Sequence, residues 1–191
     1  MLAVIGSTGF NEDGGEINSF LYHNSYEILL ETIGELKETH LISGGCAFSD
    51  HLAVRAYLEG EIKNLTLVLP SRFTNCKYIK TTYGRVAQHH HEMFSEKCNV
   101  DSLKEIDLAI EKGANLIICK DFLERNSKII ELSNKMIAFT FEKDILIDDY
   151  YLNRNKLAKI SSFSTRDAWN KSKHYYFKRH VGYKGIRGFN V

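Results

Sequence analysis

The chain has 191 residues, of which 43% are hydrophobic and 26% are charged, and its 25 basic side chains are nearly balanced by 24 acidic ones. This composition is that of a soluble globular protein, and no apolar run approaches the roughly 20 residues that a membrane-spanning helix needs. We therefore exclude a disordered chain and a membrane span, and we expect one domain over residues 1–191.

Strands and helices are predicted to alternate along the chain. Apolar runs predict strands at residues 2–5, 41–43, 65–69, 116–119 and 136–141, and segment 175–180 is expected to be the last strand. Helical spacing and capping residues predict helices within 17–37, after Gly45, and at 83–97, 101–111, 124–132 and 165–173. A loop is expected around Asn75, and segment 142–160 breaks the alternation as an insertion would.

This order of elements predicts an α/β fold. We expect a single Rossmann-like, doubly wound and mostly parallel sheet with helices on both faces. In such sheets, ligands bind outside the carboxyl ends of the strands, near the point where the strand order reverses. Loops that follow the predicted strands are therefore the candidate binding elements.

The loop after the second strand has the features of a phosphate-binding turn. Gly44 and Gly45 let the backbone approach a ligand closely, and the N-terminus of the next helix attracts anions. Ser49 and Asp50 are expected in the first turn of that helix. A plain structural turn of an α/β domain is the alternative for this loop taken alone.

The loop after the first strand contains small hydroxyl residues. Ser7 and Thr8, next to Gly6, could donate to a phosphate or a ribose. The loop is followed by no Gly-Lys-Ser/Thr and lacks the full GxGxxG spacing, so nucleotide triphosphatase chemistry is disfavoured.

The cysteines and histidines favour neither a metal nor a cofactor. The four cysteines form no CxxC pair, so we expect small, mostly buried thiols; they are Cys46, Cys76, Cys98 and Cys119. Residues 89–91 are consecutive histidines, which point about 100° apart on a helix and cannot share one ion. Because the apolar stretch at 2–5 is too short for a signal peptide, we expect a cytoplasmic protein.

Three segments together resemble the SLOG superfamily, which unites Smf/DprA-like, YpsA/YspA-like and LOG-type Rossmannoid proteins. Segment 41–60 is similar to its strand, Ser-Gly-Gly turn, aspartate and alanine-rich helix, with Cys46 in place of alanine and Phe48 in place of glycine. Segment 122–141 resembles its Arg-Asn element with the following apolar helix and strand. Segment 161–181 resembles its late Gly-Thr turn and helix, with serine where glycine is usual.

The resemblance implies a nucleotide or nucleotide-derived ligand that bears a phosphoribosyl group. An arginine can hold phosphate through paired donors, and the amide beside it can read a ribose or a base edge. The residues expected to line the site are Gly6, Ser7, Thr8, Gly44, Gly45, Ser49, Asp50, Arg125, Asn126, Ser164 and Thr165.

Binding, for sensing or sequestration, is favoured over turnover. LOG-type phosphoribohydrolases carry a Pro-Gly-Gly-x-Gly-Thr-x-x-Glu motif whose glutamate assists cleavage of the N-glycosidic bond, and this chain has neither that proline nor that glutamate. Asp50 and Asp167 are the carboxylates expected near the pocket, and helix capping is favoured over catalysis for both. A nucleoside-monophosphate N-glycosidase or base-transfer enzyme, with Asp50 as the catalytic carboxylate, is the alternative.

A second alternative is a DprA-like protein that associates with single-stranded DNA. Basic and aromatic residues interleave between Lys171 and Phe189, a pattern that suits a nucleic-acid backbone and stacked bases. The net charge of +1 counts against it. Homo-oligomers are usual in the superfamily, and we expect a homodimer.

Overall fold

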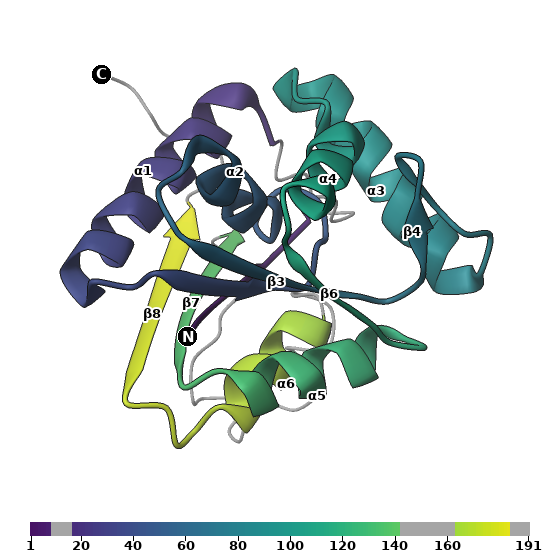
Figure 1. The fold of residues 1–191 in the computed structure, drawn as a ribbon. Helices are drawn as coiled ribbons and strands as arrows, with labels where there is room; N and C mark the ends of the chain where they lie inside the picture. Colours follow the sequence, from purple (N-terminus) through teal and green to yellow (C-terminus); the bar gives the residue numbers. More distant parts are fainter. Residues whose placement is uncertain (9–16, 142–162, 184–191) are drawn as a thin grey trace.

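The computed structural model describes residues 1–8, 17–141 and 163–183 (Figure 1). The predicted insertion at 142–160, Gly9 of the first loop and the C-terminal residues 184–191 lie outside these ranges. Every helix and strand below belongs to the described residues.

A six-stranded sheet forms the centre of the molecule, and all of its pairings are parallel. The strands lie in the order β6-β3-β2-β1-β7-β8. Their bounds are β1 (Leu2–Gly6), β2 (His40–Ser43), β3 (Asn64–Leu69), β6 (Asn115–Ile118), β7 (Lys135–Phe141) and β8 (Phe177–Tyr183). The predicted α/β fold with its Rossmann-like sheet is confirmed.

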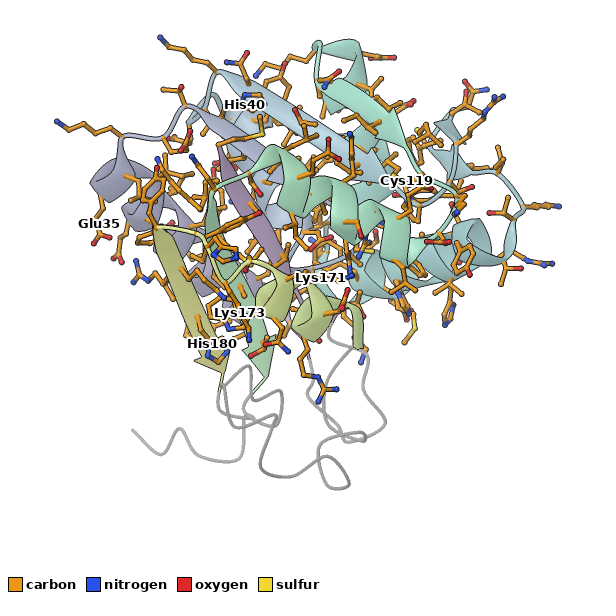
Figure 2. All side chains as sticks on the ribbon, turned by 90° about the horizontal axis from the view of Figure 1, so that it is seen from below. Glu35, His40, Cys119, Lys171, Lys173 and His180 are labelled. Atoms are coloured by element: carbon orange, nitrogen blue, oxygen red, sulfur yellow. The ribbon has the colours of Figure 1, made fainter. Side chains whose placement is uncertain are left out.

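Helices cover both faces of this sheet (Figure 1). One layer contains α1 (Ser19–Leu36), α2 (His51–Glu59), α3 (Thr82–Cys98) and α4 (Ser102–Glu111). The other contains α5 (Phe122–Leu132) and α6 (Phe163–Lys171), which lie in front of the sheet in Figure 2. No helix among the described residues is long and apolar enough to cross a membrane.

The strand order reverses beside β1. The chain winds from β1 through β2 and β3 to β6 on one side, and β7 and β8 then continue the sheet on the other side of β1. Ligands of doubly wound sheets bind outside the carboxyl ends of the strands at such a switch. The loop after β1 therefore lies at the expected ligand crevice.

Polar side chains start four of the helices where the sequence places a capping residue. Asn18, Thr81, Asp101 and Asp121 each accept a hydrogen bond from a backbone N–H in the first turn of the following helix. Each such cap satisfies an N–H group that has no partner within the helix. Asp101, the first residue of the helix predicted at 101–111, is the N-cap of α4.

Two features of the fold differ from the prediction. Part of the loop expected around Asn75 is a short antiparallel hairpin, β4 (Phe73–Thr74) and β5 (Lys77–Tyr78). In α1, Phe20 is 69% exposed, although it is one of the apolar residues at helical spacing that predicted this helix, whereas Tyr22 and Tyr26 are only 2% exposed. Tyr22 packs edge-on against Phe94 of α3, with ring centroids 5.0 Å apart. Because of this contact, the face of α1 that carries Tyr22 and Tyr26 is turned toward the core.

Candidate functional site

The loop between β2 and α2, residues 44–50, is named here the glycine turn. All of its residues are buried. Gly45 and Phe48 both have φ near +59°, a left-handed conformation that glycine adopts without the steric cost that a side chain brings. Ser43 braces the turn, because its hydroxyl donates to the carbonyl of Asp50 at 2.7 Å and accepts from the N–H of Gly45 at 3.3 Å.

Gly44 lies directly against two buried charges. A Cβ at this position would come within 2.6 Å of the Asp50 carboxylate and 3.0 Å of the Arg125 guanidinium. Contacts this short are not tolerated by real side chains, so a larger residue would displace one or both groups. Glycine at 44 is thus required by the packing of the turn, independently of any ligand.

Arg125 reaches the glycine turn from α5, as the sequence predicted for the site. Its guanidinium is 5% exposed and donates twice to the side-chain oxygen of Asn126, at 3.2 and 3.0 Å. The third donor lies 2.7 Å from the sulfur of Cys46. The Asp50 carboxylate is 3.9 Å away, and the ring of Phe122 lies beneath the guanidinium at 5.0 Å. The donors of Arg125 are therefore directed at the protein itself.

Asp50 is a second buried charge rather than a helix cap. It has helical backbone angles, φ −68° and ψ −30°, and its side chain makes no capping hydrogen bond. A cap needs an extended backbone to swing its side chain over the first turn. The carboxylate instead accepts from the backbone N–H of Cys46 at 3.3 Å. The capping interpretation of Asp50 was wrong for this reason.

The electrostatics of this cluster follow from its burial. Loss of solvent raises the pKa of the Asp50 carboxyl, and the Arg125 charge and hydrogen bonds from the N–H groups of Cys46 and Gly6 oppose that rise. Burial likewise raises the pKa of the Cys46 thiol. Removing either member of the Arg125–Asp50 pair would leave an uncompensated buried charge.

Ser49 and Thr165 connect the glycine turn, β7 and α6 to the end of β1 at the switch in strand order. The hydroxyl of Ser49 donates to the backbone carbonyl of Ser7 at 2.7 Å, and Phe139 of β7 offers a second carbonyl at 3.3 Å. Thr165 of α6 donates to the carbonyl of Gly6 at 2.9 Å. Segments far apart in sequence thus meet where the fold predicts a ligand.

Only Gly6 and Thr8 are partly exposed among the predicted site residues whose burial the structure describes. Ser164 lies in the first turn of α6, and its side chain is outside the described part. Gly6 is tightly confined, since a Cβ there would come within 2.6 Å of the Ser49 hydroxyl. The accessible part of the site is therefore the end of β1.

Two residues that the sequence analysis did not assign hold the glycine turn from its far side. The hydroxyl of Tyr78 and Nε2 of His91 each lie 2.9 Å from the carbonyl oxygen of Gly45. For His91 to donate to this carbonyl, the hydrogen must be on Nε2, so that Nδ1 accepts from the Ser102 hydroxyl at 3.0 Å. Burial lowers the pKa of His91 to about 4, which keeps this ring neutral near pH 7.

The histidine triplet is explained by this contact. His91 is fully buried, whereas His89 is exposed and His90 is half-buried. Within the described residues, no three His, Cys, Asp or Glu side chains form a group that could hold a metal ion. From the sequence, His91 could have been singled out only as a histidine on the side of a predicted helix that faces the core. Its contact with Gly45 depends on the tertiary fold.

Asp167 takes no part in the cluster around the glycine turn. It lies inside α6, four residues after the helix begins, so a capping role for it was also wrong. Its carboxylate forms an ion pair with Lys171 one turn later, at 2.7 Å. This i, i+4 pair is partly exposed and stabilises the helix only slightly.

Basic residues near the C-terminus make contacts within the protein. Arg179 of β8 donates to Thr32 at 2.7 Å and lies within 4 Å of Glu31 and Glu35, both on α1. Lys178 donates to the backbone carbonyl of Trp169 at 2.7 Å. Figure 2 shows Lys171 and Lys173 near α6 and Glu35 on a different part of the molecule.

Comparison with known proteins gives one informative relative. The chain is 32% identical over 182 residues to "Uncharacterized protein R261" of Acanthamoeba polyphaga mimivirus, and the match covers 91% of each chain. The chain belongs to the same family as this viral protein. No protein-family model and no solved structure matches the chain. The name of the viral relative states no activity, so any function has to be argued from the site.

Proposed function

We propose that the protein binds a nucleotide or a nucleotide-derived ligand with a phosphoribosyl group, at the carboxyl ends of β1, β2 and β7. The observation that carries this proposal is the meeting of the end of β1, the glycine turn and the start of α6 at the switch in strand order, where Ser49 and Thr165 bond to the end of β1. Rossmann-like sheets bind nucleotides at this place. The resemblance of the same three segments to the SLOG superfamily supports the same ligand.

The buried side chains of this site bond to protein groups, so a ligand would have to contact its partly exposed end. Arg125 and Asn126 hydrogen-bond to each other, and Ser49 is bonded to backbone carbonyls. We therefore assign Arg125 the role of fixing the glycine turn, in place of a direct phosphate clamp. The phosphate contacts would come from the partly exposed end of β1, where Thr8 lies.

Binding without turnover is favoured by the position of Asp50. Its carboxylate is 3% exposed and is held by the N–H of Cys46 beside Arg125. A glycosidase carboxylate has to face the anomeric carbon, either to stabilise positive charge or to activate water. A role for Asp50 in the architecture of the site fits its contacts better than a catalytic one.

The remaining expectations belong to the same proposal. A sensing or sequestering protein of this kind would act in the cytoplasm and as a homodimer. DNA association is less supported, since Arg179 and Lys178 are engaged within the protein.

The experiment is the identification of small molecules released from the purified, heat-denatured protein by mass spectrometry, followed by calorimetry with the four ribonucleoside monophosphates. We expect a nucleotide in the released fraction and saturable binding of at least one monophosphate. Thr8→Val should weaken that binding several-fold, whereas Thr74→Val, an exposed threonine on β4, should leave it unchanged. If no nucleotide is released and none of the four binds, the proposal is wrong.

A further inference from the structure

A cavity open to solvent lies in the helical layer, and none of its lining residues belongs to the glycine turn. It has a volume of about 450 Å³ and is lined by residues of α1, α2, α4 and the end of α3. We name it the helix-layer cavity. The residues of its lining that matter below are Tyr22, Arg55, Leu58, Cys98, Val100 and Glu105. Its volume is in the range of small-molecule sites.

A guanidinium with free donors lines one part of the helix-layer cavity. The Nε of Arg55 donates to Glu59 at 2.8 Å, and Tyr26 donates to the same carboxylate at 2.7 Å. The guanidinium lies over the ring of Tyr26, at 4.4 Å from its centroid. Its two terminal nitrogens have no hydrogen-bond partner among the described residues. Arg55 is thus held in place while two of its nitrogens remain free for an anionic group.

A carboxylate without hydrogen bonds lines the same cavity. Glu105 of α4 accepts no hydrogen bond from the residues that the structure describes, and Nε2 of His51 lies 3.3 Å from its carboxylate. His51 is fully buried, and its Nδ1 is bonded to the Tyr22 hydroxyl at 2.8 Å. Nε2 itself has no partner of hydrogen-bond geometry. The polar groups around Glu105 are therefore incompletely satisfied.

The pKa shifts of His51 and Glu105 follow from their burial and from the charges around them. Burial lowers the pKa of His51 well below its usual value, so this ring does not supply a positive charge to Glu105 near pH 7. Burial raises the pKa of Glu105, and the Arg55 charge opposes the rise. Arg55 is near enough to act on Glu105, yet the two side chains form no ion pair with each other in the described structure.

We propose that the helix-layer cavity binds a free α-amino acid. The carboxylate of the ligand would accept from the terminal nitrogens of Arg55, and its ammonium group would donate to Glu105. A ligand with only one of these charges would leave the opposite protein charge without a partner, which costs free energy in a partly desolvated site. Leu58, Cys98 and Val100 line the same cavity and suit a hydrocarbon side chain, so we expect an aliphatic amino acid.

The test is calorimetry of the full chain with L-leucine and with two analogues that each lack one charge. 4-Methylpentanoate lacks the ammonium group, and 3-methylbutylamine lacks the carboxylate. We expect saturable binding of L-leucine and at least roughly tenfold weaker binding of both analogues, which corresponds to the loss of one charged contact. This comparison uses the unaltered protein, so it does not depend on how a variant folds.

Variants then locate the site. Glu105→Gln and Arg55→Gln should each weaken L-leucine binding about tenfold or more, whereas Glu111→Gln, at the exposed end of the same helix, should have no effect. The ring ¹⁵N signal of His51 should shift on addition of L-leucine. The proposal is overturned if L-leucine and other aliphatic amino acids do not bind, if either analogue binds equally well, or if binding persists unchanged in both cavity variants.

Discussion

The glycine turn and the helix-layer cavity both contain charged side chains, which are buried in the turn and partly exposed in the cavity, and the contacts of these side chains differ. At the glycine turn, each of the three guanidinium nitrogens of Arg125 donates to a protein group. Asp50 accepts from the backbone N–H of Cys46 and lies beside the Arg125 charge. In the helix-layer cavity, Arg55 and Glu105 line the same space without contacting each other. The first arrangement fixes a backbone conformation, and the second leaves polar groups for a bound molecule.

This difference separates residues that shape a site from residues that touch a ligand. Polar side chains at a loop of a Rossmann-like sheet are readily assigned to ligand contact from sequence. Here Ser49, Asp50 and Arg125 bond to protein groups, and the ligand contacts that we propose lie at the end of β1, near Thr8. The comparison therefore predicts large stability effects at the glycine turn and small ones in the cavity.

The largest expected effect is the loss of the Arg125 charge. Arg125→Met should destabilise the protein by about 3–5 kcal/mol, because it leaves the Asp50 carboxylate buried beside Cys46 without its cation. Urea unfolding measures this change. Adding Asp50→Asn should recover part of the loss, and Lys128→Met on the exposed face of α5 should change stability by less than about 0.5 kcal/mol. An Arg125 variant as stable as the wild type would show that the pair is not structural.

The second effect concerns pH. The pKa of His91 falls to about 4 in the folded protein, whereas an unfolded histidine has an ordinary value near 6.5. The unfolded chain therefore takes up the proton first as pH falls, so His91 contributes stability above about pH 6.5 that is lost on acidification toward pH 4. The loss is about 3 kcal/mol for this residue.

Comparison with a variant isolates this contribution from other groups that titrate in the same range. His91→Gln keeps an amide that can donate to the Gly45 carbonyl but does not titrate. The free energy of unfolding of wild type minus that of the variant should fall as pH goes from 7 to 4, as measured by urea unfolding at each pH. A difference that stays constant over this range would contradict the account.

A third effect tests the packing of the glycine turn. Gly44→Ala should destabilise the protein by about 1–3 kcal/mol, because its Cβ would press on the Asp50 and Arg125 side chains. Gly34→Ala is the matched control, since a Cβ at this position in α1 meets nothing within 4 Å, and it should stabilise by up to about 1 kcal/mol. Thermal unfolding of the two variants should give shifts of opposite sign. Equal shifts would mean that the turn tolerates a side chain.

The smallest effect is expected in the helix-layer cavity. Glu105→Gln removes a carboxylate whose burial raises its pKa and which has no hydrogen bond in the described structure. We expect a change in stability within about 0.5 kcal/mol of zero, in either direction, by urea unfolding without added amino acid. A loss as large as that of Arg125→Met would remove the distinction between the two regions.

The sheet could be predicted closely from the sequence, whereas the orientation of α1 could not. Five of the six strands contain short apolar runs, whereas β8 carries Lys178, Arg179 and His180, and all six predicted positions overlap the observed ones. In α1, tyrosines rather than Phe20 face the core because Phe94 and Phe48 offer an aromatic contact from distant segments. Periodicity alone does not reveal such a contact.

The sequence predicted that these residues lie close together, but it did not predict which hydrogen bonds they form. Gly44, Asp50 and Arg125 do come together, because the ends of parallel strands meet at one edge of the sheet. Which atom each side chain faces depends on backbone angles and on helices elsewhere. Asp50 does not cap its helix because its own backbone is helical, and His91 reaches Gly45 only through the packing of α3.

The most direct test of a nucleotide site at the end of β1 is a titration of the ¹⁵N-labelled protein with ribonucleoside monophosphates, followed by two-dimensional NMR. The account predicts that the largest amide shifts occur at residues 6–8 and 44–50, with smaller shifts near Thr165. Saturable shifts confined to other parts of the molecule, or no shifts with any of the four nucleotides, would contradict it.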